Sequence, residues 1–209
     1  MSLYDILWSD NQMGNPAREI INRKGSVAMP ASAQEKLYTI DDIYALSDGE
    51  RAELIDGKIY MMAPPNRKHQ TIVRELFSSI NSYIKSKGGS CELFFAPFAV
   101  FLNKDDTNYV EPDISVICDK SKLTDKGCYG APDWIIEIVS PSSRTMDYYK
   151  KLFKYRTAGV REYWIVDYER NLVIVYDFEN DNAANYTCAD DIPSGIYPGF
   201  SINLSMLDI

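Results

Sequence analysis

The stretch WIIEIVS, residues 134–140, places a glutamate between isoleucines in the middle of an apolar run. Its other residues suit a buried β-strand, but Glu137 carries a carboxylate. A buried carboxylate costs free energy unless it is paired, bound to a metal or protonated. The stretch therefore predicts either a strand with one wet face or a partner for Glu137 elsewhere in the chain.

A second acidic strand precedes this one, in YVEPDISVIC, residues 109–118. Because side chains alternate along a strand, Glu111, Asp113 and Ser115 share one face. If the two strands pair in register, Asp113 and Glu137 point into one cavity, where their charges repel each other. A hard divalent cation such as Mg²⁺ or Mn²⁺ relieves such repulsion. The alternative is that both acids form ordinary salt bridges on a solvated face.

Turn signals and hydrophobic periodicity divide the rest of the chain. Residues 1–36 show weak periodicity and are interpreted as an N-terminal extension, which leaves residues 37–209 as a single domain. Thr39 opens a short helix, and the Asp56-Gly57 pair between apolar runs predicts a β-hairpin. The order that follows predicts an α/β domain, a central mixed β-sheet flanked by helices. Its predicted helices are 69–87 and 146–159, and its predicted strands are 91–102, 109–118, 131–140, 161–167 and 171–178.

Composition limits the classes of function. The sequence shows no apolar run long enough to cross a bilayer and no secretory leader, so we expect a cytoplasmic protein without a membrane partner. The net charge of -8 argues against a general nucleic-acid coat, because such proteins bind phosphate through cations. Residues 144–161 are locally basic, however, and Arg144, Lys150 and Lys154 are candidate phosphate contacts. The four cysteines form no C-x-x-C pair, and we expect reduced, partly buried thiols.

The ordered motifs resemble a known family. Pro112-Asp113, a gap and then Glu137-Ile138-Val139 is similar to the pattern of the PD-(D/E)XK nuclease superfamily. With ELIDGKIYMMAPP, the following HQ, and D-x-x-x-K-x-x-x-Y, the chain resembles the Uma-type family of restriction-endonuclease-like proteins over about residues 37–178. The resemblance implies a restriction-endonuclease-like core, a divalent metal and phosphodiester cleavage. It also implies that Glu53, His69 and Gln70 lie near the site, although a lone histidine is more often a capping or core residue.

The lysine departs from the superfamily pattern. It should stand two residues after the glutamate, where this chain has Val139, and the family pattern offers Lys151 between Asp147 and Tyr155 instead. On an α-helical wheel Lys151 lies at the edge of the apolar face, from which a long side chain can reach a cleft. The alternative is a solvated lysine that pairs weakly with Asp147.

Together these features predict a Mg²⁺- or Mn²⁺-dependent DNA endonuclease. Asp113 and Glu137 would hold the metal, with Glu53 and the backbone carbonyl of Ile138, and Lys151 would orient water or offset charge on the phosphate. Cleavage of a duplex needs two sites, so we expect a homodimer. Two alternatives stay open: a nucleic-acid-binding or regulatory module with a decayed site, and a scaffold protein.

Overall fold

The computed structural model describes residues 36–141 and 143–207. The chain divides into two units, Met1–Lys36 and Leu37–Ile209, and the second carries all the elements below. All but the last residue of the extension predicted for residues 1–36 lies outside the described residues. Within the described part of the chain, no helix is long and apolar enough to span a membrane.

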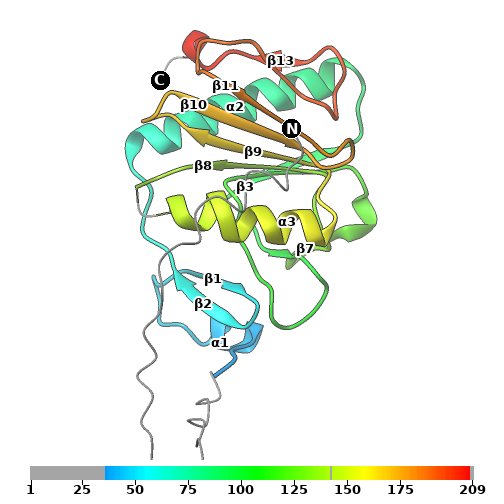
Figure 1. The fold of residues 1–209 in the computed structure, drawn as a ribbon. Helices are drawn as coiled ribbons and strands as arrows, with labels where there is room; N and C mark the ends of the chain where they lie inside the picture. Colours follow the sequence, from blue (N-terminus) through cyan, green and yellow to red (C-terminus); the bar gives the residue numbers. More distant parts are fainter. Residues whose placement is uncertain (1–35, 142, 208–209) are drawn as a thin grey trace, which may run out of the picture. The chain divides into compact units, whose positions relative to one another are not determined.

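A mixed sheet of six strands forms the centre of the fold (Figure 1). Strands β8 and β9 run parallel, and every other neighbouring pair is antiparallel. A parallel pair needs a crossover connection, and a helical segment between β8 and β9 supplies it. The predicted mixed α/β architecture is therefore confirmed. The strand order is β11 (Asn182–Tyr186), β10 (Leu172–Asp177), β9 (Glu162–Asp167), β8 (Trp134–Ile138), β5 (Ile114–Ile117) and β3 (Glu92–Phe95).

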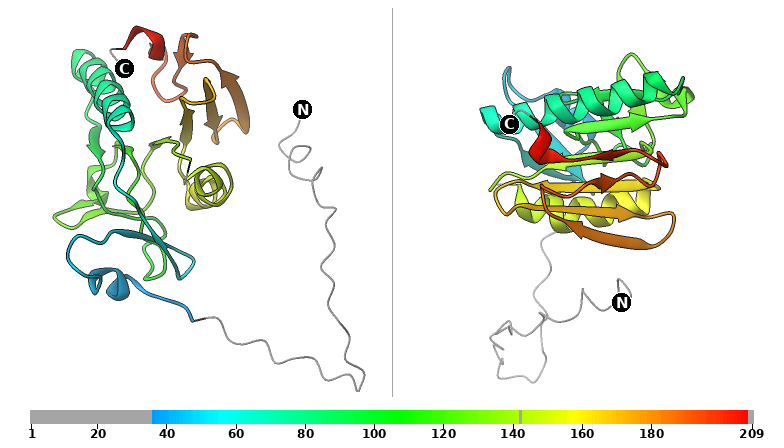
Figure 2. Two further views of the ribbon diagram at one scale, coloured as in Figure 1. Left: turned by 90° about the vertical axis from the view of Figure 1, so that its left-hand side faces the viewer. Right: turned by 90° about the horizontal axis from the view of Figure 1, so that it is seen from above.

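Helices cover both faces of this sheet (Figure 2). Helix α2 (Arg67–Ser86) buries Ile72, Leu76, Ile80 and Ile84, which recur at helical spacing and pack in one core with the sheet. It begins two residues earlier than predicted, because the side chain of Asn66 accepts a hydrogen bond from the backbone N–H of His69 and caps the helix.

The opposite face is covered by the helical segment between β8 and β9. This segment starts as a π-helix, η3 (Met146–Lys151), and continues as α3 (Leu152–Ala158). Tyr155 of α3 packs in a second core that includes Ile135 of β8 and Val139, which directly follows that strand. Glu137 lies between these two residues on the same face of β8, so its carboxylate points toward the helical segment rather than toward α2.

The predicted N-terminal helix and hairpin are confirmed as α1 (Ile40–Tyr44), β1 (Ala52–Ile55) and β2 (Lys58–Met61). Asp56 and Gly57 join the two strands with φ angles of 50° and 71°, which is the backbone that a tight hairpin turn requires. A backbone bridge between Leu54 and Tyr109 ties the hairpin to the chain leading into β5.

Several predicted strands are shorter than expected. The stretch 91–102 forms β3 and then β4 (Val100–Phe101) in separate sheets, with a cis Ala96–Pro97 bond between them. Only Ile114–Ile117 of the stretch 109–118 joins the central sheet. Strand β11 was not predicted, because its sequence, NAANY, lacks apolar alternation at the sheet edge. The smaller elements are η2 (Lys120–Lys122), β6 (Leu123–Thr124), β7 (Gly127–Tyr129), β12 (Ile192–Pro193), β13 (Ser201–Ile202) and η4 (Leu204–Met206).

The prediction that the cysteines are reduced thiols is wrong for one pair. Cys91 and Cys118 form a disulfide with an S–S distance of 2.09 Å. Cys91 precedes Glu92 and Cys118 follows Ile117, and these two residues pair at the ends of β3 and β5, so the strand pairing brings the cysteines together across 27 residues of sequence. Cys128 and Cys188 are free.

Candidate active site

Strand pairing places Asp113 opposite Glu137. Ile114 of β5 pairs with Ile136 of β8 in an antiparallel ladder, so the next position in register sets Asp113 against Glu137. The backbone N–H of Asp113 lies 3.4 Å from Oε2 of Glu137. Both carboxylates line one cavity of about 400 Å³. The two acids are thus brought together by the same alternation of strand faces that the sequence shows.

Two donors hold one oxygen of Asp113. The backbone N–H of Ile138 donates to Oδ2 at 2.8 Å, and Nε2 of His69 lies 3.1 Å from the same oxygen. The Asp113 side chain is 17 % exposed, whereas His69 is buried and its Nδ1 has no hydrogen-bond partner among the described residues. His69 therefore acts on Asp113 from helix α2, while the other carboxylate oxygen of Asp113 remains available to the cavity.

Lys151 lies at the centre of a carboxylate cluster. Its Nζ is 2.9 Å from Oε2 of Glu53, 3.0 Å from Oε1 of Glu137 and 3.7 Å from Oδ1 of Asp147. The lysine side chain is only 6 % exposed, which is deeper than the edge position of an α-helical wheel implies. The difference follows from the π-helix, whose wider turn changes the direction of each side chain. Lys151 is therefore not a solvated lysine that pairs only with Asp147, because its side chain is buried and contacts three carboxylates.

Tyrosines support the cluster from the helical side. The hydroxyl of Tyr155, a fully buried residue, donates to Oε1 of Glu137 at 2.7 Å. The hydroxyl of Tyr163 in β9 donates to the backbone carbonyl of Asp147 at 3.0 Å. Glu137 Oε1 therefore receives both a tyrosine hydroxyl and the Lys151 ammonium, which fixes its orientation.

Glu53 enters the cluster from the hairpin. Its Oε1 accepts a hydrogen bond from the backbone N–H of Glu111 at 3.0 Å, while Oε2 faces Lys151. The Glu111 carboxylate turns instead to Arg51, whose Nε lies 3.0 Å away, and to the hydroxyl of Tyr109 at 2.7 Å. Glu111 is therefore neutralised by Arg51. The contact of Arg51 with Glu111 could not be predicted from the sequence, because partners 60 residues apart follow no local spacing.

The charges in the cluster do not cancel. Glu53, Asp113, Glu137 and Asp147 line the same cavity as one buried ammonium, that of Lys151. Burial raises the pKa of Glu137 well above its usual range and that of Asp147 to about 6, despite the neighbouring Lys151. Burial alone would lower the pKa of Lys151, but Glu137, Glu53 and Asp147 outweigh it and raise that pKa. Lys151 is thus firmly charged within a site that retains excess negative charge.

The pKa of His69 is also set by burial on one side and by a neighbouring carboxylate on the other. Burial lowers its pKa, but the hydrogen bond and the charge of Asp113 outweigh burial, so the pKa of His69 lies above its ordinary value. His69 and Asp113 therefore form an ion pair that links helix α2 to the acid immediately before β5.

The mouth of the cavity is formed by different residues. Gln70 of α2 is exposed there, as the sequence resemblance implies. The segment Met61–Pro65, which begins with the last residue of β2, lines the cavity with apolar side chains, and Pro141 and Met146 add to it. This apolar rim was not predicted as part of the site, although MMAPP is visible in the sequence.

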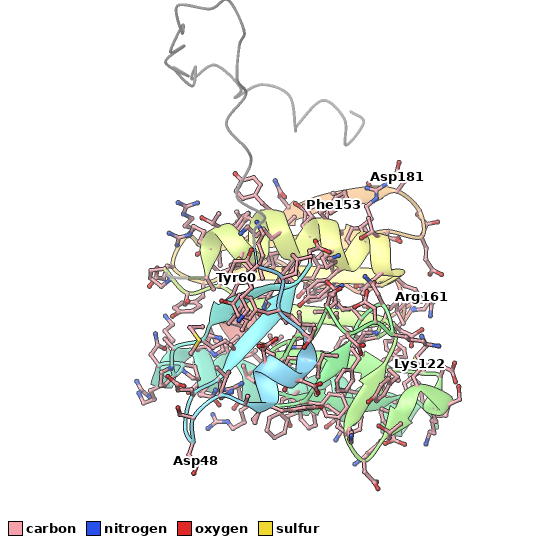
Figure 3. The ribbon with its side chains drawn as sticks, turned by 90° about the horizontal axis from the view of Figure 1, so that it is seen from below. Asp48, Tyr60, Lys122, Phe153, Arg161 and Asp181 are labelled. Atoms are coloured by element: carbon pink, nitrogen blue, oxygen red, sulfur yellow. A yellow bond between two sulfur atoms is a disulfide. The ribbon has the colours of Figure 1, made fainter. Side chains whose placement is uncertain are left out.

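The basic candidates lie away from the carboxylates and are paired. Arg144 contacts Asp167 through Nε at 3.2 Å, and Lys154 is buried against Asp56. Lys150 is exposed, lies 4.3 Å from the centre of the Tyr60 ring and donates to the Tyr60 hydroxyl at 2.8 Å. Tyr60 is labelled in Figure 3. Of these three candidates, Lys150 is the one whose side chain lies at the surface.

The mixed sheet, the facing acids on β5 and β8, and the buried lysine define a restriction-endonuclease-like protein. The family model Uma2, described as "Putative restriction endonuclease", matches residues 37–205. That match covers most of the chain, and the chain belongs to this family. Its family is therefore one of nuclease-like proteins.

A solved structure shares this fold, and two curated relatives match part of the chain. A crystal structure described as that of a putative nuclease belonging to DUF820, from Anabaena variabilis, shares the fold with a TM-score of 0.66 and 23% identity. That comparison covers 80% of this chain and 95% of the other. Two uncharacterized Synechocystis proteins, slr1290 and sll1609, are 29% and 26% identical over 98 and 121 residues. These alignments span 50% and 67% of the relatives and 47% and 56% of this chain.

Proposed function

We propose that the protein is a Mg²⁺- or Mn²⁺-dependent nuclease that hydrolyses phosphodiester bonds, with DNA as its substrate. The observation that carries the proposal is the excess of negative charge around Lys151. Five acidic residues, namely Glu53, Glu111, Asp113, Glu137 and Asp147, line one cavity against Lys151, Arg51 and His69, and Asp113 and Glu137 face each other across paired strands. Keeping such a cluster without a functional cation would cost stability.

The donor set suits a hard divalent cation. Oxygen atoms of Asp113 and Glu137 face the cavity, and Ile138 lines it as well. Among the described residues no three acidic, histidine or cysteine side chains are grouped as a ready-made metal site. Mg²⁺ commonly binds through one or two carboxylates, with water and substrate phosphate completing its shell. Asp113, Glu137 and the carbonyl of Ile138 fit that mode, and Glu53 is held nearby by Lys151.

Each residue of the site has a separate role in the proposed hydrolysis. A bound cation would polarise the phosphate and lower the pKa of a bound water. Lys151, charged beside Glu137, would orient the attacking water and offset negative charge that develops on the phosphate. Tyr155 and His69 hold Glu137 and Asp113 in place through hydrogen bonds. Hydrolysis forms a bond from the water oxygen to phosphorus and breaks the bond to the leaving oxygen, which takes up a proton.

The remaining proposals concern partners. Lys150 and Arg144 would contact phosphates that flank the scissile bond, and Lys154 contributes less because it is buried against Asp56. We also propose a homodimer in the cytoplasm, which would bring two such sites together.

A plasmid assay tests the proposal. Native protein with supercoiled plasmid and either Mg²⁺ or Mn²⁺ should nick or linearise it, and Glu137→Gln should abolish this. The control is Glu162→Gln, because Glu162 is equally buried but binds Trp164 and the backbone of Ile196 outside the cavity. Mn²⁺ should raise the melting temperature of the native protein and of Glu162→Gln, but not that of Glu137→Gln. A native protein that binds DNA but cuts nothing in either metal would favour the decayed binding module.

A further inference from the structure

We infer that the substrate is unpaired nucleic acid, a single strand or an unpaired loop, rather than an intact duplex. This inference rests on the proposed function and narrows its substrate class. Three features of the described residues carry it: the depth of the acids, the internal pairing of the cations, and the apolar rim of the cavity.

The acids lie below the surface. The side chains of Glu53 and Glu137 are each 5 % exposed, and Asp113 reaches 17 %. A scissile phosphate must therefore enter a cavity of about 400 Å³ to approach them. A duplex is stiff and carries its phosphates on the outside of a broad rod, whereas an unpaired nucleotide can leave the stack and enter a recessed site.

The charges at the surface do not match a duplex. Tight duplex binding commonly uses about 6–10 phosphate contacts from free cations. Most cations of the segment beside the site instead already have an acidic or tyrosine partner within the protein, whether they are buried or at the surface. The pairs are Arg144 with Asp167, Lys150 with Tyr60, Lys151 with Glu53 and Glu137, Lys154 with Asp56, Arg156 with Asp181 and Arg161 with Asp133. A short, flexible single strand can be bound with fewer phosphate contacts than a duplex.

The rim offers apolar atoms where a base would lie. Met61 is 57 % exposed at the end of β2, and Met62 and Pro64 follow it along the cavity. Methionine adapts its shape to varied partners, and methionine and proline side chains are known to contact unstacked bases. Base faces are hidden in an intact duplex and accessible in an unpaired strand, so this rim is useful only for the latter.

The test compares three forms of one labelled DNA oligonucleotide: single-stranded, fully paired, and paired with a central unpaired loop. Binding is measured by fluorescence anisotropy, and cleavage is measured with Mg²⁺ and Mn²⁺. We expect the single strand and the loop to be bound and cut at least about tenfold better than the duplex, with cuts inside the loop. A duplex that is bound and cut as well as the single strand overturns the inference and leaves the nuclease proposal standing. Preferred binding of the single strand without any cleavage overturns the nuclease proposal and leaves the preference for unpaired nucleic acid standing. If no form of the DNA is bound, both proposals are overturned.

A pair of variants tests the rim. Met61→Ala should weaken binding of the single strand about fivefold while its duplex binding changes little. Met206→Ala is the matched control, because Met206 is 82 % exposed and does not line the cavity. Equal single-strand affinities of Met61→Ala, Met206→Ala and native protein would refute the contact between the rim and the base.

Discussion

Replacing Lys151 by methionine should destabilise the protein strongly at neutral and alkaline pH. Methionine keeps most of the length of the side chain but removes the ammonium, which lies 2.9 Å from Glu53 and 3.0 Å from Glu137. The variant leaves these buried carboxylates and Asp147 without their cation. Removing one partner of a buried ion pair typically costs about 3–5 kcal/mol. A solvated lysine that pairs weakly with Asp147, the alternative that the sequence leaves open, would instead predict a loss below about 1 kcal/mol.

The size of the effect can be checked by melting. For a domain of this size, about 1 kcal/mol corresponds to a shift of about 2–4 °C in Tm, so Tm should fall by roughly 10 °C at pH 8. The deficit should shrink at pH 5. Burial already raises the pKa of Glu137, and that of Asp147 to about 6, so in the variant these acids take up protons in the folded state as the pH falls.

Divalent cations add a second readout. If the cluster accepts a cation, Mg²⁺ or Mn²⁺ should stabilise Lys151→Met more than the native protein, because the metal replaces part of the missing charge. The control is Lys150→Met, since Lys150 is the neighbouring lysine but is exposed and donates to Tyr60. A loss below about 1 kcal/mol at pH 8, or equal losses in the two variants, would refute the claim that Lys151 balances the buried acids.

Three further predictions concern neighbouring parts of the fold. Tyr155→Phe removes the hydroxyl bound to Glu137 and should cost about 1–3 kcal/mol, measured by urea unfolding, and should also slow plasmid cleavage. Asp147→Asn should stabilise the protein at pH 8 by on the order of 3 kcal/mol and not at pH 4, because a folded-state pKa of about 6 instead of 3.8 makes the ionised acid unfavourable above that range. An equal change at both pH values would contradict this. The double variant Cys91→Ser, Cys118→Ser should lose about 3–4 kcal/mol by the chain-entropy estimate for a 27-residue separation, and adding reductant to native protein should reproduce the loss.

The central part of the site was predictable because it depends on strand alternation. Asp113 and Glu137 each sit among apolar residues of a short strand, and antiparallel pairing of neighbouring strands can bring such positions face to face. The hairpin that carries Glu53 was predictable for a similar reason, since Asp56 and Gly57 are typical of a two-residue turn. Local rules thus determined the sheet side of the cavity.

The rest depended on contacts between distant residues. Arg51 reaches Glu111 across 60 residues, and Cys91 reaches Cys118 only because β3 pairs with β5. Lys154 was expected to be a free phosphate contact, yet it is buried against Asp56 of the hairpin. A lysine-rich stretch predicts a solvated face when it is considered alone. The tertiary fold instead supplies each of these cations with an acidic or tyrosine partner.

The position of the lysine follows from the π-helix. Val139, where the superfamily pattern has its lysine, is 1 % exposed and packs in the core between β8 and the helical segment. Lys151 reaches Glu137 from the other side of that same core, and its ammonium lies 3.0 Å from the carboxylate. What stabilises charge is the position of the ammonium, not the strand or helix that carries it. The π-helix turns Asp147 and Lys151 toward the sheet, and α3 then adds Tyr155 to the same oxygen of Glu137. Residue 139 is thereby free to remain a valine, and the strand keeps an apolar core position beside the acid.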